Sequence, residues 1–190
     1  MGWVDRVPRA GNLFIGGLYA LYQPNAVKEA GITHVLSVID FDVFQRKEAA
    51  TFLQSKNYEH LNINIDDAPN EDLLQYFKQM TDFIDNGLSS GGSVYVHCAM
   101  GKSRSATAVT AYLMRKYGYD RDTALAQLCE GRPVCFPNPG FMEQLAVWEK
   151  VLKTDSEDEA KAIYNDWQQN RFIGDWSEWE RRDPRLRAKL

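Results

Sequence analysis

The sequence lacks the long apolar runs and the cysteine pairs that mark whole classes of protein. No apolar stretch approaches the roughly 18 residues of a membrane-spanning helix, and no signal-peptide core precedes the first proline. The three cysteines, Cys98, Cys129 and Cys135, form no C-x-x-C pair and have no zinc-ligand spacing with the three histidines. We therefore expect no metal or other cofactor, a reducing setting in the cytoplasm and nucleus, and a structural role for Cys129 and Cys135.

The chain also has no excess of positive charge. Its formal net charge is −4, which gives no electrostatic evidence of nucleic-acid binding. Met1-Gly2 begins like a myristoylation signal, but Arg6 stands where serine or threonine is needed, so we expect no membrane partner. With 190 residues, 44% of them hydrophobic, the chain can bury one sizeable core, which favours a single domain with a tail.

Apolar periodicity predicts strands that alternate with helices. The expected strands are residues 12–18, 32–39, 58–65 and 94–97. The expected helices are residues 24–30, 46–56, 72–88, 103–117, 120–130 and 138–153, with Gly31 and Gly118 as stops. This order indicates an α/β fold with a central parallel-rich sheet, helices on both faces, and a ligand site at the carboxyl ends of the strands. We expect His34 to be a satisfied core or strand-edge histidine.

The composition changes after residue 153. Residues 154–159 are acidic and read most simply as a solvated boundary, residues 160–169 have helical potential, and the end of the chain is basic. The tail tryptophans are Trp167, Trp176 and Trp179. These are too many for a purely disordered tail. We expect a domain over residues 1–153 and a tail over residues 154–190 that packs partly on the domain or awaits a partner.

One stretch combines a strand, a lone cysteine and a helix start: Val94-Tyr-Val-His-Cys-Ala-Met-Gly-Lys-Ser-Arg-Ser105. It places Cys98 beneath a helix N-terminus, where unpaired N–H groups favour a thiolate and a second anion. If the loop curls, its amides and the Arg104 guanidinium can bind three phosphoryl oxygens above the sulfur. Gly101 would be needed where a side chain obstructs the curl or φ is positive. The expected phosphate-binding residues are Ala99, Met100, Gly101, Lys102, Ser103 and Arg104. The alternative is that Cys98 is only a small buried hydrophobe.

The pattern His-Cys-x-x-Gly-x-x-Arg-Ser over residues 97–105 resembles the signature of the cysteine-dependent protein tyrosine phosphatase superfamily. The fuller Val-His-Cys-Ala-Met-Gly-Lys-Ser-Arg-Ser-Ala-Thr resembles its dual-specificity branch. The resemblance implies a metal-independent phosphatase with Cys98 as nucleophile, Arg104 as phosphate clamp and His97 as a supporting residue. Its substrate would be a phosphorylated protein, hydrolysed at phosphotyrosine and phosphoserine or phosphothreonine through a cysteinyl-phosphate intermediate. Relatives that act on lipids or RNA ends share the core signature, so those substrates stay open.

This chemistry requires a general acid, and two aspartates compete for the role. Asp66 and Asp67 lie between an expected strand and an expected helix, where such a loop belongs. In the family the acid precedes a helix with an aromatic pair resembling Tyr76-Phe77, and that spacing selects Asp67. Asp66 would be a solvated neighbour or turn former. Ser105 would donate to the Cys98 sulfur and stabilise it as a leaving group; the alternative is a hydroxyl bonded to backbone.

Further expectations rest on the resemblance. Residues 131–141 resemble a segment that passes close to the active-site loop, so Asn138 either braces that loop or only caps a helix. Residues 13–18 and 31–38 look most like the subgroup with a C-terminal zinc-binding domain, which is linked to large-ribosomal-subunit assembly. No such domain is present: the chain is a fragment of a longer protein, or that part never existed. The alternative function is an assembly or docking factor for ribosome maturation, contacting a pre-ribosomal particle through the absent domain, with phosphatase activity secondary.

Overall fold

A five-stranded sheet lies at the centre of the computed structural model, which describes residues 3–55 and 58–187. The strand order is β1-β2-β5-β3-β4; β1 is antiparallel to β2, and the other neighbours pair in parallel. The strands are β1 (Val4–Arg6), β2 (Leu13–Gly17), β3 (His34–Ile39), β4 (Glu59–Asn64) and β5 (Val94–Cys98). The expected α/β fold with a parallel-rich sheet is confirmed.

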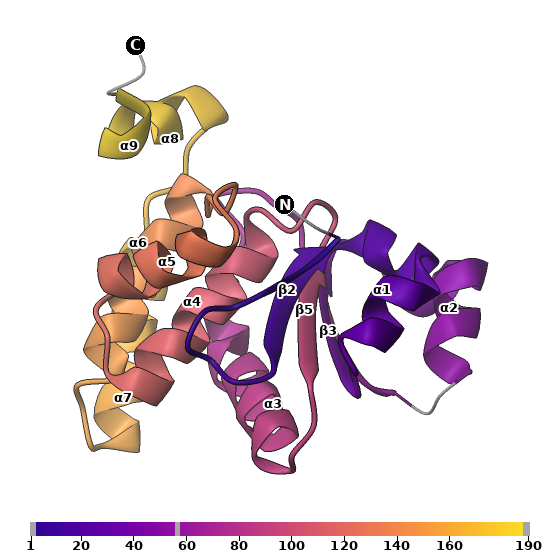
Figure 1. The fold of residues 1–190 in the computed structure, drawn as a ribbon. Helices are drawn as coiled ribbons and strands as arrows, with labels where there is room; N and C mark the ends of the chain where they lie inside the picture. Colours follow the sequence, from indigo (N-terminus) through magenta and orange to yellow (C-terminus); the bar gives the residue numbers. More distant parts are fainter. Residues whose placement is uncertain (1–2, 56–57, 188–190) are drawn as a thin grey trace.

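Helices cover both faces of the sheet (Figure 1). One face carries α1 (Pro24–Glu29) and α2 (Lys47–Gln54); the other carries α3 (Phe77–Ser89), α4 (Arg104–Tyr117), α5 (Arg121–Gly131) and α6 (Pro139–Val151). Short 3₁₀ helices are η1 (Leu18–Tyr22), η2 (Val43–Gln45) and η3 (Leu74–Tyr76). Apart from α3, the bounds lie within about two residues of those expected, and the expected end at Lys56 falls outside the described residues. Gly118 ends α4 with φ 69°, the left-handed conformation expected of a glycine stop.

The central strands bring their carboxyl ends to one edge of the sheet. Every residue of β3 and β5 is buried, as expected for strands covered on both faces. Strand β5 pairs on one side with β2, Gly17 opposite Cys98, and on the other with β3, Ser37 opposite His97. Cys98 therefore ends its strand between the ends of two neighbours, where a parallel sheet places its ligand site.

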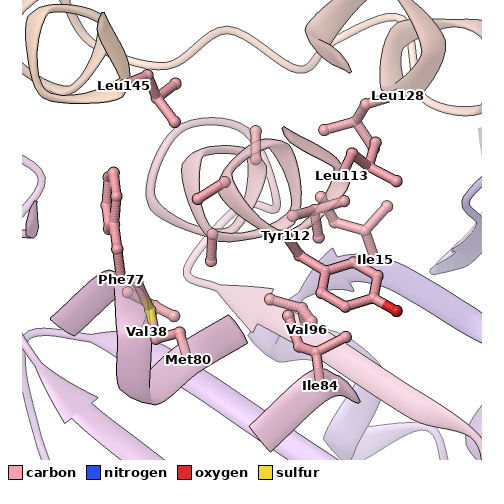
Figure 2. Packing of buried hydrophobic residues seen from close by; sticks show 14 of the residues in the cluster. Ile15, Val38, Phe77, Met80, Ile84, Val96, Tyr112, Leu113, Leu128 and Leu145 are labelled. Atoms are coloured by element: carbon pink, nitrogen blue, oxygen red, sulfur yellow. The ribbon is translucent and has the colours of Figure 1, made fainter. Parts of the chain in front are cut away.

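Helix α4 is the buried centre of the larger helical layer. Its side chains are buried without interruption from Arg104 to Met114. Figure 2 shows the surrounding apolar side chains, which include Phe77, Met80 and Ile84 of α3, Leu128 of α5, Leu145 of α6, and Ile15, Val38 and Val96 of the sheet. Burial of each such large side chain contributes about 1.5–3 kcal/mol. Packing from all sides makes the first turn of α4 a fixed platform for the preceding loop.

The start of α3 differs from the expected helix over residues 72–88. The helix proper begins at Phe77, after the 3₁₀ turn η3. The Oε1 atom of Gln144 accepts hydrogen bonds from Leu73 N at 2.9 Å and Leu74 N at 2.8 Å. The expectation was wrong here because a side chain of α6 takes these amides, which local periodicity cannot reveal.

Strand β1 was not expected from the sequence. It has three residues, of which Asp5 and Arg6 are charged, and it pairs with β2 at the edge of the sheet. So short a strand is formed by its pairing rather than by its own propensity. The expected role of His34 is confirmed: the side chain is buried, with Nδ1 2.7 Å from Thr33 Oγ1 and Nε2 3.2 Å from Glu59.

The C-terminal segment forms α7 (Glu157–Asn170), α8 (Trp176–Arg182) and α9 (Pro184–Arg187). The acidic run is exposed, but it forms the first turn of α7, with Ser156 as N-cap, instead of a linker. Negative charge at a helix N-terminus is favourable, which explains why the helix starts earlier than expected. Trp179 is buried and Trp176 is half exposed, so part of the tail packs on the domain. The domain boundary at residue 153 stays a prediction.

Within residues 3–55 and 58–187, no helix is both long and apolar enough to cross a bilayer. The same ranges contain no group of three histidine, cysteine or acidic side chains placed to hold a metal ion.

Candidate active site

Cys98 lies at the end of β5 under the first turn of α4, and its side chain is buried. Its sulfur accepts a hydrogen bond from Gly101 N at 3.2 Å, and Ser105 Oγ lies 3.3 Å from it. Hydrogen bonds to sulfur from an amide and a hydroxyl stabilise a negative charge on it. The geometry therefore presents Cys98 as a supported nucleophile rather than as a core side chain.

The loop from Ala99 to Ser103 points its carbonyls away from the sulfur. Four consecutive carbonyl oxygens are bonded by donors from outside the loop. These bonds are Leu18 N to Ala99 O (3.1 Å), Arg132 Nη2 to Met100 O (3.0 Å), Arg132 Nε to Gly101 O (2.8 Å) and Phe136 N to Lys102 O (2.7 Å). In a planar trans peptide the next N–H points opposite to the carbonyl. The amides of residues 100–103 thus face inward, as an oxyanion requires.

Gly101 meets both conditions that the sequence suggested for it. Its φ is 69°, in the left-handed region, and a Cβ there would overlap the carbonyl oxygen of Gly16 on β2. The loop curls against the end of β2 so closely that no side chain fits. In contrast, the side chain of Met100 is 74% exposed at the rim of the loop, and Lys102 is also exposed.

Arg132 is the residue that sequence analysis missed. Its side chain is 5% exposed, and Nη1 donates to Asp5 Oδ2 at 2.6 Å while Nε and Nη2 hold two loop carbonyls. A planar guanidinium can bond three acceptors in this way, whereas a lysine ammonium cannot match the geometry. The Gly-Arg-Pro run within residues 131–141 was the available signal, because that segment was expected near the loop.

The Arg104 guanidinium extends across the top of the sheet. Nη1 donates to Asp40 Oδ1 and to Ile65 O, both at 3.0 Å. The arginine holds the pKa of Asp40 below its usual range. In the described part of the chain Nε is buried without a hydrogen-bond partner, 4.0 Å from Asp67 Oδ2. A buried donor left unpaired is costly, so this atom is suited to an incoming oxyanion.

Asp67 is held in place from two directions. Its Oδ1 accepts from Ser103 Oγ at 2.6 Å and from Asn138 Nδ2 at 2.9 Å, while Oδ2 faces Arg104. Asp66 is its exposed neighbour. Ser103 does not cap α4 with its side chain, which leaves the N-terminal amides of the helix open to a ligand.

Asn138 combines the two alternatives that the sequence left open. Its Oδ1 accepts from Phe141 N at 2.9 Å, which caps α6, and its Nδ2 donates to Asp67. Its backbone N donates to Ser103 Oγ at 3.1 Å. Asn138 therefore connects the start of α6 with the phosphate-binding loop and with the loop that carries Asp67.

His97 does not reach the phosphate-binding side of the loop. The ring is buried beside Ser37, whose Oγ lies 2.6 Å from Nε2, and Nδ1 donates to Cys98 O at 3.3 Å. That bond assigns the proton to Nδ1, so Nε2 accepts from Ser37, which in turn accepts from His60 Nε2 at 2.8 Å. Burial lowers the pKa of His97 to about 4, so the ring is neutral and orients the end of β5.

The other two cysteines lie close to each other, with Cys129 Sγ 3.5 Å from Cys135 O. Burial raises the pKa of Cys135 to about 12 and also raises the pKa of Cys129. Both remain thiols at neutral pH, as their expected structural role requires.

Comparisons with known proteins agree with this geometry. Residues 13–151 match the family model "Dual specificity phosphatase, catalytic domain". A probable dual specificity protein phosphatase of Dictyostelium discoideum is 39% identical over 144 residues, 76% of this chain and 34% of that protein. The tyrosine-protein phosphatase YVH1 of Saccharomyces cerevisiae is 34% identical over 181 residues, 86% of this chain and 48% of that protein. The chain thus spans a third to a half of the length of these two relatives.

The fold is likewise shared with a solved phosphatase domain. The crystal structure of the Yvh1 phosphatase domain from Chaetomium thermophilum has a TM-score of 0.69 and 38% identity, covering 80% of this chain and 99% of that one. The match to the catalytic-domain model covers well over half of the chain and includes Cys98, Arg104 and Asp67. The chain therefore belongs to the dual-specificity phosphatase family.

Proposed function

We propose that this chain hydrolyses phosphotyrosine and phosphoserine or phosphothreonine in proteins through a cysteinyl-phosphate intermediate. The observation that carries the proposal is the arrangement around Cys98. Its sulfur lies below inward-facing loop amides and 3.3 Å from Ser105 Oγ. Arg104 Nε, which has no hydrogen-bond partner among the described residues, lies 4.0 Å from Asp67 Oδ2. The nucleophile, the phosphate clamp and the acid thus all lie at the loop between β5 and α4.

In the first step the Cys98 thiolate attacks phosphorus. A sulfur–phosphorus bond forms as the ester phosphorus–oxygen bond breaks, and the electron pair leaves with the ester oxygen. The loop amides and Arg104 stabilise the charge on the three equatorial oxygens. Asp67 donates its proton to the leaving oxygen; Oδ2 carries that proton, because Oδ1 already accepts from Ser103 and Asn138.

In the second step water attacks the phosphorus of the intermediate. Asp67, now a carboxylate, accepts a proton from that water, and the sulfur–phosphorus bond breaks with its electrons returning to sulfur. Ser105 donates a hydrogen bond to the departing thiolate, which makes sulfur a better leaving group. Inorganic phosphate is the product, and Cys98 is regenerated.

Activity of the purified chain on an aryl phosphate tests this mechanism. The polypeptide supplies the nucleophile, the clamp and the acid, so we expect activity that chelator does not change and that vanadate inhibits as a phosphate mimic. Cys98→Ser should abolish turnover. Turnover that survives this substitution, or that chelator removes, would overturn the thiol mechanism.

Matched phosphopeptides test the dual specificity. Two peptides that differ only in the phosphorylated residue, tyrosine or serine, should both be hydrolysed. Strict selectivity for phosphotyrosine would contradict this part of the proposal. A lipid phosphate or a 5′-phosphorylated RNA that outperforms both peptides would assign the site to the substrates of other relatives.

A second candidate function is suggested by the extent of one match. The similarity to yeast YVH1 covers 86% of this chain, which is more than its first 151 residues, and the family model ends at residue 151, so the similarity continues into the C-terminal segment. We infer that the full protein also acts as an assembly or docking factor in ribosome maturation, in the cytoplasm and nucleus. Its partner would be a pre-ribosomal particle bound through a zinc-binding domain beyond the sequence given.

Growth complementation separates these two functions. A full-length gene carrying Cys98→Ser should rescue a null strain if assembly is the required role and should fail if catalysis is. A full-length gene without a cysteine- and histidine-rich segment after residue 190 would remove the basis for the assembly role.

A further inference from the structure

The loop that carries Asp67 is bonded to the C-terminal segment. Asn70, three residues after Asp67, donates from Nδ2 to Gly174 O at 2.8 Å, and its Oδ1 accepts from Gly174 N at 3.2 Å. The same oxygen accepts from the indole Nε1 of Trp179 at 2.8 Å. One amide side chain is thus held by three hydrogen bonds from residues more than 100 positions away.

Trp179, which donates one of these three hydrogen bonds, is buried. Its exposure is 3%, and it packs edge-on against Phe172 with 4.9 Å between ring centroids. The guanidinium of Arg182 covers the Phe172 ring at 4.1 Å. By contrast, Trp176 on the same helix is 50% exposed and its Nε1 bonds to Glu180 one turn away. The two tryptophans therefore have different environments on one short helix.

A second set of hydrogen bonds holds the loop that carries Asp67, at Asp72. Asp72 is buried, and its Oδ2 accepts from Tyr164 Oη at 2.6 Å and from Gln168 Nε2 at 2.9 Å, both on α7. Its Oδ1 accepts from Gln75 N at 3.2 Å. Helices α7 and α8 therefore hold positions 72 and 70 of the loop independently.

A third contact lies next to Asn138, the residue that bonds Asp67. Arg185 donates from Nη2 to Pro137 O at 2.9 Å, and its guanidinium lies 4.3 Å from the centre of the Phe136 ring. The next residue, Asn138, is the one that bonds Asp67. In Figure 1, α8 and α9 lie at the same end of the molecule as the carboxyl ends of the strands.

We propose that residues 157–187 are a positioning element for the general acid, with Trp179 and Asn70 as the pair that sets the Asp67 loop. The inference rests on the acid role proposed for Asp67. Proton transfer needs the acid within hydrogen-bond reach of the leaving oxygen, and a small displacement reduces it strongly. Within the described residues, the side chains of Trp179 and Asn70 have no hydrogen bond to Cys98 or Arg104, so the effect of this pair falls on leaving-group protonation.

A series of aryl phosphates with leaving groups of increasing basicity tests the proposal in the full chain. Trp179→Phe keeps an aromatic ring and removes the hydrogen bond to Asn70. We expect kcat/KM to fall by about tenfold for the most basic leaving group, part of the range of about 10²–10⁴-fold that a general acid supplies. For the least basic leaving group the change should stay below about twofold, because departure then needs little proton donation.

Trp176→Phe is the matched control and should match the wild type on every substrate. Asn70→Ala removes the other partner of this hydrogen bond and should show the same dependence on the leaving group. It replaces Trp179→Phe in the test if that variant folds poorly. In an Asp67→Ala background, Trp179→Phe should cause no further loss, because coupled residues are not additive.

Two outcomes separate failure of this inference from failure of the proposed function. An equal loss on all substrates, or no loss, in both Trp179→Phe and Asn70→Ala would overturn the positioning role. If Asp67→Ala itself shows no dependence on the leaving group, the acid assignment is wrong instead. Far-ultraviolet circular dichroism and the melting temperature identify any variant whose loss reflects unfolding.

Discussion

Asn138 donates from Nδ2 to Asp67 Oδ1 at 2.9 Å, across 71 positions of sequence. With the Ser103 hydroxyl on the same oxygen, this bond fixes one side of the carboxyl and leaves Oδ2 turned toward Arg104. The Asp67 carboxyl is therefore fixed by Ser103 of the loop and by Asn138 at the start of α6.

We expect Asp67→Ala to reduce turnover of substrates with poor leaving groups by about 10²–10⁴-fold, the usual contribution of a positioned general acid. Asp66→Ala is the matched control and should reduce it far less, because Ser103 and Asn138 hold the carboxyl of Asp67 and not that of Asp66. Steady-state kinetics on phenyl phosphate compare the two variants. The reverse ranking would show that the acid was assigned to the wrong aspartate.

Ser105→Ala should slow the breakdown of the intermediate more than its formation. The hydroxyl lies 3.3 Å from Cys98 Sγ, and a hydrogen bond to a charged group contributes about 1.5–3 kcal/mol, a factor of about 10–150 in rate. Rapid-mixing kinetics should reveal a burst of phenol followed by slow turnover. Ser105→Thr keeps the hydroxyl and should restore most of the rate. A variant without a burst, slowed equally in both steps, would argue against this role.

Arg132→Lys should weaken vanadate inhibition by about tenfold or more, since a single ammonium cannot replace the bonds to two loop carbonyls and Asp5. Arg121→Lys is the control: this arginine lies on α5 and bonds Asp122 and Met142 O. The inhibition constant and the melting temperature are the readouts. Unchanged vanadate affinity in Arg132→Lys would contradict the view that Arg132 shapes the loop.

Acid should destabilise the protein partly through His97. Burial lowers its folded-state pKa to about 4 from the ordinary histidine value of 6.5. Its contribution to stability is therefore complete above pH 6.5 and is lost as the pH falls toward 4, because protons bind preferentially to the unfolded chain. Between pH 7 and pH 5 this one group should lower the free energy of unfolding by about 2 kcal/mol.

Urea unfolding at both pH values measures that loss. His97→Asn has no titrating ring at this position and should lose less over the same interval. His60, whose pKa burial also lowers, contributes to the pH dependence in both proteins. Equal losses in the wild type and His97→Asn would contradict the shift assigned to His97.

Local patterns sufficed for the strand, loop and helix around Cys98. The β-branched run of β5, the glycine at position 101 and the glycine stop at position 118 each express a backbone requirement that adjacent residues reveal. The choice of Asp67 over Asp66 came from a family resemblance, and the hydrogen bonds of Asp67 agree with it.

Contacts between distant segments could not be predicted in this way. Strand β1 exists because β2 offers an edge, and α3 starts late because Gln144 takes two amides. Asp40 joins the site through folding alone, since nothing near it in sequence marks a partner at Arg104. The segment that contains Arg132 was expected near the loop, but the sequence did not indicate its bond to Gly101 O. Each of these depends on tertiary structure, which overrides local propensity.

The ion pair between Asp5 and Arg132 spans 127 positions, and its arginine holds the phosphate-binding loop from behind. The phosphate-binding loop can therefore take its final conformation only after the ribosome has released the chain as far as Arg132. A shorter nascent chain contains Cys98 but lacks the arginine that holds the loop carbonyls. During refolding, catalytic activity should return with the last long-range contacts, after helical circular dichroism has recovered, because such contacts form slowly. Phosphatase activity should thus appear only at a late stage of folding, and partly folded molecules should have none.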